Sequence, residues 1–403
     1  NENFDVVYRV IQIGGRDACV YFVDGFAKDE IMEKLLEFFY GIQDEDLLRD
    51  AHTFSKSCVP YCEVAISGEE DTIVGQILSG VWAVFVDGMD QCVLIDQRTY
   101  PQRTTSEPDQ DKSFRGSRDG FVETMVFNAA LIRRRIRSPR LCVEHLEVGE
   151  TSRTDVAVCY FEGRADPELV NTVRERIAQA RVDALTMNQE SLAELLVRKR
   201  WYNPFPKFKF TERPDAAAAQ ILEGDVVVLV DNSPAAIILP TTLFDVMEEA
   251  NDYYFPPITG SYLRLVRFFT TFLTTFLTPV WLLLSQEPER VPGWLEFILM
   301  EEPAQVPPLL QLLILELAID GLKLAALNTP NILTTSFSMI GAIILGDFAV
   351  QSGWFSAEVM LYMAVVAIAN YNQPNLELGY ALKFMRLILL VATGLLGLWG
   401  FVG

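Results

Sequence analysis

Three charged residues interrupt a leucine-rich stretch in the C-terminal part of the chain. Glu316, Asp320 and Lys323 are spaced at i, i+4 and i+7, which places them on one face of a helix. Charged side chains inside a hydrophobic segment normally face protein or water. Two interpretations follow: an internal pair of Asp320 with Lys323 that fixes packing, or a polar stripe that faces a permeation path.

The next apolar stretch carries hydroxyls and small residues instead of a charged stripe. Its polar and small residues are Thr334, Thr335, Ser336, Ser338, Gly341, Gly346 and Asp347. Small residues let helices approach closely, so packing is one interpretation. Hydroxyls also line pores, and an acid repeated once per subunit would form a ring at the outer mouth. The candidate pore-lining or selectivity residues are therefore Glu316, Asp320, Lys323, Thr334, Thr335, Ser338 and Asp347.

Catalytic and metal-binding patterns are missing from the sequence. Gly14-Gly15-Arg16 is not a glycine-rich phosphate loop, and no Walker-type loop occurs. The two histidines, His52 and His145, have neither ligand spacing nor the local signature of a nucleophilic triad. We expect no enzyme activity, no metal and no cofactor.

The six cysteines all lie in the N-terminal part, mostly inside apolar runs. Cys19 stands between Ala18 and Val20, and Cys159 between Val158 and Tyr160. Such surroundings are typical of buried free thiols in a reducing compartment.

Charge divides the chain into two parts of different composition. Only 15 of the 87 Asp, Glu, Lys and Arg residues follow Arg264. The net charge of −21 argues against a nucleic-acid partner, because a phosphate binder needs a surplus of basic residues. We expect an α/β soluble N-terminal region followed by an all-α polytopic transmembrane domain.

Strand-like and helix-like patterns alternate through the soluble region and suggest two or three small subdomains. We expect a first α/β subdomain over residues 1–118, ending in a polar, mobile loop over 103–118. A second, with a proline-containing linker, covers 119–255. An apolar run followed by Asp-Gly occurs at 20–25 and at 83–88, which indicates strand exits or hairpins.

An arginine-rich run marks the end of a helix predicted over 119–137. Arg133, Arg134, Arg135 and Arg137 stand at its C-terminal end, where positive charge suits the helix dipole. We interpret the run as a solvated helix end; a contact with lipid headgroups or with another subunit is the alternative.

The transmembrane domain is predicted over residues 256–403, with about five helices. The segments are 265–284, 309–327, 332–350, 355–370 and 380–402, and their lengths fit a hydrocarbon core about 30 Å thick. Basic residues flank the first and fifth segments, whereas the loop 286–306 is acidic, so the soluble region is expected on the cytoplasmic side. We expect the natural protein to begin before Asn1 and to continue past Gly403.

Several long strings carry a family resemblance. They are Asp119-Gly-Phe-Val-Glu-Thr124, Asn128-Ala-Ala-Leu-Ile-Arg-Arg-Arg-Ile136, Asn203-Pro-Phe-Pro206, Thr211-Glu-Arg-Pro-Asp-Ala-Ala-Ala218 and Leu222-Glu-Gly-Asp-Val226. Through them the chain resembles the A-subunit family of spore germination receptors, the GerA family, along nearly its whole length. Within that family, Gly346-Asp-Phe-Ala-Val-Gln-Ser-Gly-Trp354 resembles the branch of stage V sporulation protein AF.

The resemblance implies a location, an assembly and partners. The location is the inner membrane of the bacterial spore, multi-pass, with the soluble domain in the spore core. The assembly is a ring-shaped homo-oligomer that forms a cation channel opening during germination, and the partners are other membrane subunits of a germination complex. A non-conducting scaffold subunit is the main alternative. A secondary transporter is a weaker one, because the sequence has no pair of inverted repeats.

Overall fold

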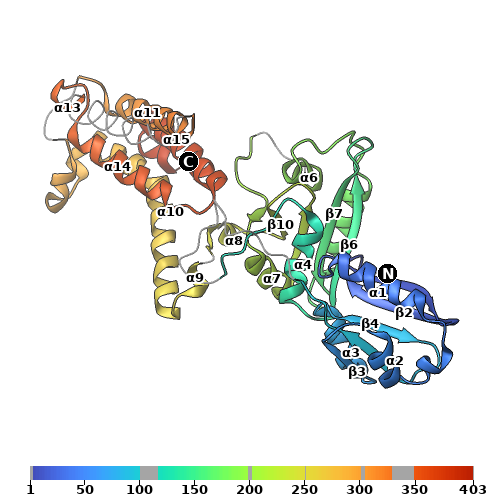
Figure 1. Ribbon diagram of the computed structural model, residues 1–403. Coiled ribbons are helices and arrows are strands. Elements are labelled where there is room, and N and C mark those ends of the chain that lie inside the picture. Colours follow the sequence, from blue (N-terminus) through green and yellow to red (C-terminus); the bar gives the residue numbers. More distant parts are fainter. Residues whose placement is uncertain are drawn as a thin grey trace. The chain divides into compact units, whose positions relative to one another are not determined.

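The computed structural model describes residues 3–99, 117–197, 202–249, 251–300, 305–328 and 349–402. It divides into two compact units. The α/β unit comprises Asn1–Lys199 with Lys207–Thr242, and the helical unit comprises Arg200–Pro206 with Leu243–Gly403. Figure 1 shows two β-sheets in the first unit and helices in the second. The expected mobile loop falls almost wholly outside the described residues.

The first sheet has five antiparallel strands in the order β1-β2-β4-β5-β3. These strands are β1 (Val6–Ile13), β2 (Arg16–Val23), β3 (Val64–Ser67), β4 (Trp82–Val86) and β5 (Cys92–Ile95). One face packs on α1 (Asp29–Gly41), η1 (Glu45–Leu48) and α2 (Ala51–Cys58). The opposite face packs, over β4 and β5, on α3 (Glu70–Leu78).

The second sheet is also antiparallel, in the order β6-β7-β9-β10-β8. Its strands are β6 (Leu141–Val148), β7 (Thr154–Phe161), β8 (Lys209–Thr211), β9 (Val226–Val230) and β10 (Ala236–Leu239). Helices cover both faces, so β9 and β10 are buried along their whole length and contain only apolar residues. One face packs on α4 (Met125–Arg135) and α7 (Pro214–Glu223), the other on α5 (Pro167–Ala178) and α6 (Gln189–Leu196).

Both Asp-Gly pairs stand where a strand ends, as the sequence predicts. Gly25 follows β2 with a φ of 80°, and Gly88 follows β4 with a φ of 84°. A positive φ is easily adopted by glycine and disfavoured for other residues. The second pair forms the turn of the β4–β5 hairpin, and the first leads from β2 towards α1.

The predicted helix over 119–137 is wrong at its start. The helix α4 begins only at Met125, because the preceding backbone is bonded elsewhere. The Phe121 N–H donates to the Glu212 carbonyl, and the Val122 N–H donates to Asn128 Oδ1 at 2.8 Å. These bonds hold residues 121–122 outside the helix.

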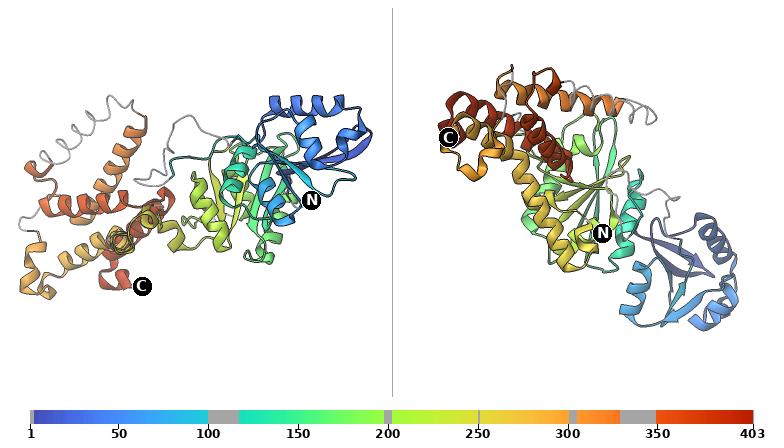
Figure 2. Two further views of the ribbon diagram at one scale, coloured as in Figure 1. Left: turned by 60° about the horizontal axis from the view of Figure 1, so that its bottom comes forward. Right: turned by 90° about the vertical axis from the view of Figure 1, so that its left-hand side faces the viewer.

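Four long helices lie within the described residues of the helical unit. They are α10 (Pro257–Gln286), α11 (Pro308–Asn328), α14 (Ala357–Tyr371) and α15 (Leu376–Leu396). Shorter elements are α8 (Leu243–Met247), α9 (Asn251–Tyr254), η2 (Pro288–Arg290), η3 (Gly293–Ile298), α13 (Ala349–Gln351) and α16 (Leu398–Val402). Helix α10 packs along α14 and α15 (Figure 2). The predicted segment over 380–402 is therefore two helices, since Gly397 has a φ of 59° and separates α15 from α16.

All six cysteines are free, as expected. Cys58, Cys92, Cys142 and Cys159 are buried, Cys19 is half-buried, and Cys62 is exposed. The prediction of buried thiols is thus confirmed for four of the six.

Candidate functional site

The candidate site is a cluster of charged side chains buried between α10, α11 and α15. Glu316 and Asp320 are one turn apart on α11, and Lys383 and Arg386 are one turn apart on α15. Of these, Glu316, Lys383 and Arg386 are at most 5% exposed. We call these four residues the charged cluster.

Glu316 is the centre of the charged cluster. Arg386 Nε donates to Glu316 Oε1 at 2.5 Å, and Lys383 Nζ lies 3.3 Å from Glu316 Oε2. Lys383 also donates to the Glu316 carbonyl oxygen at 3.2 Å and to Asp320 Oδ2. Two carboxylates and two cations thus neutralise one another, which is what burial of charge requires.

A third helix joins the cluster through its backbone. Pro279 lies inside α10 and has no N–H, so the Thr275 carbonyl lacks its usual helical donor. At the adjacent position, the Thr274 carbonyl accepts a hydrogen bond from Arg386 Nη1 at 2.5 Å. Arg386 therefore links α10 to α11, and it does so next to the proline.

Lys323 lies on the same helix as the acids, yet it contacts aromatic rings of α14 and α15. Its Nζ is 4.6 Å from the ring centroid of Tyr371 and 5.9 Å from that of Tyr380. When the Asn370 amide is oriented to satisfy its neighbours, its oxygen accepts from Lys323 Nζ at 3.1 Å. The salt-bridge partner of Asp320 is thus Lys383, which lies on another helix. The second carboxylate oxygen of Asp320, Oδ1, has no hydrogen-bond partner in the described part of the chain.

The other candidate residues cannot be placed beside this cluster. Thr334, Thr335, Ser338 and Asp347 lie outside the described residues. The structure therefore brings together Glu316 and Asp320 from the candidate set and adds Lys383 and Arg386. Lys323 lines the same small cavity as these four residues, and its ammonium group lies over the aromatic rings.

Lys383 and Arg386 belong to the charged cluster, whereas from the sequence they were only basic residues at the start of the fifth predicted segment. The sequence contains a signal for this pairing. Lys383 and Arg386 interrupt one apolar helix at i and i+3, and the acids Glu316 and Asp320 interrupt another at i and i+4. Charges within apolar segments normally pair with one another.

A second group of charges joins the start of α10 to the preceding helices. The Arg267 guanidinium donates to Asp252 Oδ2 at 2.5 Å, to Glu249 Oε2 at 2.9 Å and to the Met247 carbonyl. Arg264 lies 3.7 Å from Glu248. The flanking arginines are therefore held by acids of the same unit.

The arginine run of α4 is only partly a solvated helix end. Arg133 is fully buried, and its Nε donates to Asp5 Oδ2 at 2.8 Å while its Nη1 donates to the Leu141 carbonyl at 3.0 Å. The prediction is wrong for this residue, because the last turn of α4 packs against β6 and the N-terminal segment. Arg137 is exposed, as predicted.

Two helices are long and apolar enough to cross a membrane among the residues that the structure describes. They are α10 and α15. Helix α14 is apolar but shorter, and α11 has 21 residues that include Glu316, Asp320 and Lys323. No group of three or more potential metal ligands occurs among the described residues.

Comparison with known proteins identifies relatives along the whole chain. Stage V sporulation protein AF of Bacillus subtilis (strain 168) is 39% identical over 99% of this chain and 81% of its own length. The uncharacterized membrane protein YfkQ of the same organism is 26% identical over 98% of this chain and 78% of its own.

The comparison with solved structures also finds the N-terminal domain of the A subunit of the Bacillus megaterium spore germinant receptor GerK3. The identity is 23% and the TM-score 0.44, over 60% of this chain and 90% of that one. The family described as Bacillus/Clostridium GerA spore germination protein matches residues 1–403. This chain is therefore a member of the GerA family of spore germination proteins.

Proposed function

We propose that the chain is a subunit of an oligomeric membrane channel that releases monovalent cations during bacterial spore germination. The helical unit spans the inner membrane of the spore, and the α/β unit lies on the core side. The family supports the biological setting, and the charged cluster supports the position in the membrane.

The observation that carries this proposal is the inverted polarity of the helical unit. The charges of the cluster are paired inside, whereas large apolar side chains project outward from α10 and α15, among them Leu265, Phe269, Ile388 and Leu395, each at least 60% exposed. Apolar side chains on the surface are unfavourable in water and favourable against lipid tails. Helices of this kind are suited to a bilayer.

The pairing inside the cluster determines which residues are available to a pore. Glu316 and Asp320 are neutralised by Lys383 and Arg386, so they hold helices together instead of presenting free charge to ions. The described helices pack on one another around this cluster, and a water-filled path therefore needs several copies in a ring. In that ring Asp347, with the hydroxyls of Thr334, Thr335 and Ser338, supplies the polar lining and the carboxylates that attract cations.

The experiment is potassium and chloride flux into liposomes that contain the purified chain, at matched protein content. We expect cation-selective flux, a particle larger than a monomer in detergent, and lower cation selectivity for Asp347→Asn. Glu377→Gln, at an exposed acid at the start of α15, is the control. A monomer that passes no ions contradicts the proposal.

A scaffold subunit without a pore is the second candidate. The internal neutralisation of Glu316 and Asp320 favours it, because a cluster whose charges are paired internally is sufficient to fix helix packing. An oligomer of defined size that passes no ions, alone or with other membrane subunits of a germination complex, is the result that selects this candidate.

A further inference from the structure

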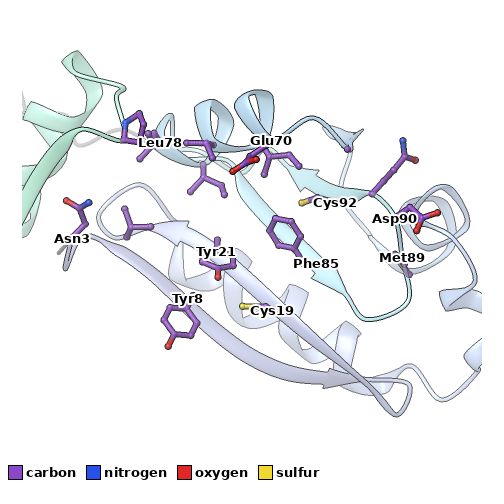
Figure 3. A pocket seen from close by; sticks show the side chains of 17 residues that line it. Asn3, Tyr8, Cys19, Tyr21, Glu70, Leu78, Phe85, Met89, Asp90 and Cys92 are labelled. Carbon is purple, nitrogen blue, oxygen red and sulfur yellow. The ribbon is translucent and has the colours of Figure 1, made fainter. Parts of the chain in front are cut away.

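The first sheet has one face that its own helices leave half open. On that face α3 covers β4 and β5, while side chains of β1, β2 and β4 line an open groove beside it (Figure 3). Tyr8 of β1 and Phe85 of β4 are 51% and 37% exposed there. A sheet face that is buried elsewhere in the domain thus presents aromatic rings to solvent.

The rings form a continuous ladder across three strands. Tyr8 stands directly opposite Tyr21 in the β1–β2 pairing, and their ring centroids are 5.7 Å apart in a stacked arrangement. Tyr21 in turn meets Phe85 edge-on at 5.7 Å. Rings held in this way offer a preformed apolar and π-rich surface, with little side-chain freedom left to lose on binding.

The groove has the volume of a small-molecule site. It encloses about 830 Å³, within the range of about 300–1,000 Å³ that is typical of ligand pockets. Apolar side chains of α3 form one wall, and Cys19 of β2 lies on the sheet side.

Two charged side chains line the described part of this groove, and both are acids. Glu70 is in the first turn of α3, and Asp90 is in the β4–β5 turn; among the residues that the structure describes, no Lys, Arg or His belongs to the lining. In the described part of the chain neither carboxylate has a hydrogen bond or an ion pair. Figure 3 shows the Glu70 carboxylate beside α3 and the Asp90 carboxylate at the β4–β5 turn, on different sides of the ring of Phe85.

We propose that this groove binds a small organic cation, an ammonium group carried on an aromatic or apolar body. The body lies on Tyr21 and Phe85, and the ammonium group is attracted by the negative charges of Glu70 and Asp90. A cation gains both from the carboxylates and from the faces of the rings. An anion would meet only negative charge, and a neutral molecule would leave both carboxylates unused.

The groove contains its own reporter, the thiol of Cys19. Burial raises the pKa of Cys19, so the free thiol reacts slowly, and a ligand above it slows the reaction further. Cys62 is exposed and outside the groove, and Cys58 is buried in the core on the other face. Cys62 therefore measures reagent activity, and Cys58 measures whether the subdomain is folded.

The test is alkylation of the full chain in liposomes by N-ethylmaleimide, followed at each cysteine by mass spectrometry. The probes are 2-phenylethylammonium, its neutral analogue 2-phenylethanol, and the anion 3-phenylpropanoate. We expect 2-phenylethylammonium to slow labelling of Cys19 about fivefold at saturation, with Cys62 unchanged and the other two probes much less effective.

Two variants locate the effect. Phe85→Ala, and Glu70→Gln combined with Asp90→Asn, should each raise the concentration for half-protection about fivefold. Asp29→Asn combined with Glu30→Gln is the matched control, because it neutralises two exposed acids in the first turn of α1, outside the groove. Cys58 should stay unlabelled in every variant that is folded.

Three results with these probes and variants overturn the proposal. They are equal protection by 2-phenylethanol, protection that the Glu70 and Asp90 substitutions leave unchanged, and no protection by any probe. Protection by a basic amphipathic peptide but not by 2-phenylethylammonium also overturns it, and assigns the groove to a protein partner.

Discussion

The guanidinium of Arg386 holds the carboxylate of Glu316, with 2.5 Å between Nε and Oε1, although the two residues lie 70 positions apart. Both side chains are buried, and Arg386 reaches the backbone of α10 as well. Removing one member of a buried ion pair leaves the other charge without compensation, which costs about 3–5 kcal/mol. The pair therefore governs how α10, α11 and α15 stay together.

Glu316→Gln should lower the stability of the helical unit by about 3 kcal/mol. The double variant Glu316→Gln with Arg386→Gln should be less destabilised than the single one, since it leaves Lys383 paired with Asp320 and no excess charge. Thermal unfolding in detergent measures both, with Glu377→Gln as the exposed control. A double variant whose loss equals the sum of the two single losses would show that the pair contributes no coupling.

The sequence predicts much of this cluster, but it does not predict its pairing. Helical spacing is sufficient to place Glu316, Asp320 and Lys323 on one face of α11, because a helix has a fixed period. It carries no information about which helix lies opposite. Lys383 and Arg386 could be assigned as partners only once the packing of α11 and α15 was known.

The same limit applies to the α/β unit. Continuous apolar runs predict strands such as β2, β4 and β9, whereas the short edge strand β8 and the start of α4 depend on tertiary hydrogen bonds. The arginine run of α4 shows the consequence. The pattern indicates a helix end correctly, yet only the contact with Asp5 distinguishes the buried Arg133 from its exposed neighbour Arg137.

Arg133→Met should destabilise the α/β unit by about 3 kcal/mol, because it leaves the Asp5 carboxylate buried without its partner. Arg137→Gln, four residues further on and exposed, should change stability by less than about 0.5 kcal/mol. Chemical denaturation followed by circular dichroism compares the two. Equal losses would mean that the Asp5–Arg133 pair is not important for the stability of this unit.

Asp50 should give the stability of the first subdomain a measurable dependence on pH. The backbone N–H and then the hydroxyl of Thr53 donate to its carboxylate at the start of α2, and they lower its pKa. A lowered folded-state pKa contributes stability above the unfolded value of about 3.9, and that contribution is lost as the pH falls through the folded value.

The measurement is thermal unfolding between pH 6 and pH 3 for the natural chain and for Asp50→Asn. We expect the stability difference between the two to shrink below about pH 4, since the carboxylate is then protonated first in the unfolded chain and, at still lower pH, in the folded chain. Asp46→Asn, at an exposed acid of η1, should leave the pH profile unchanged. A constant difference across the range would mean that the charge of Asp50 does not matter.

The orientation in the membrane gives the last prediction. Lys207, Lys209 and Arg213 precede α10, whereas the loop that follows it carries Glu287 and Glu289. Basic residues are retained on the cytoplasmic side, so the α/β unit should face the cytoplasm and the loop the outside. In a cysteine-free background, an impermeant thiol reagent applied to intact cells should label Glu289→Cys and leave Ser106→Cys unlabelled. Membrane disruption should expose both positions equally, which controls for intrinsic reactivity. Labelling at position 106 alone in intact cells would reverse the topology and place the proposed cation groove outside the spore core.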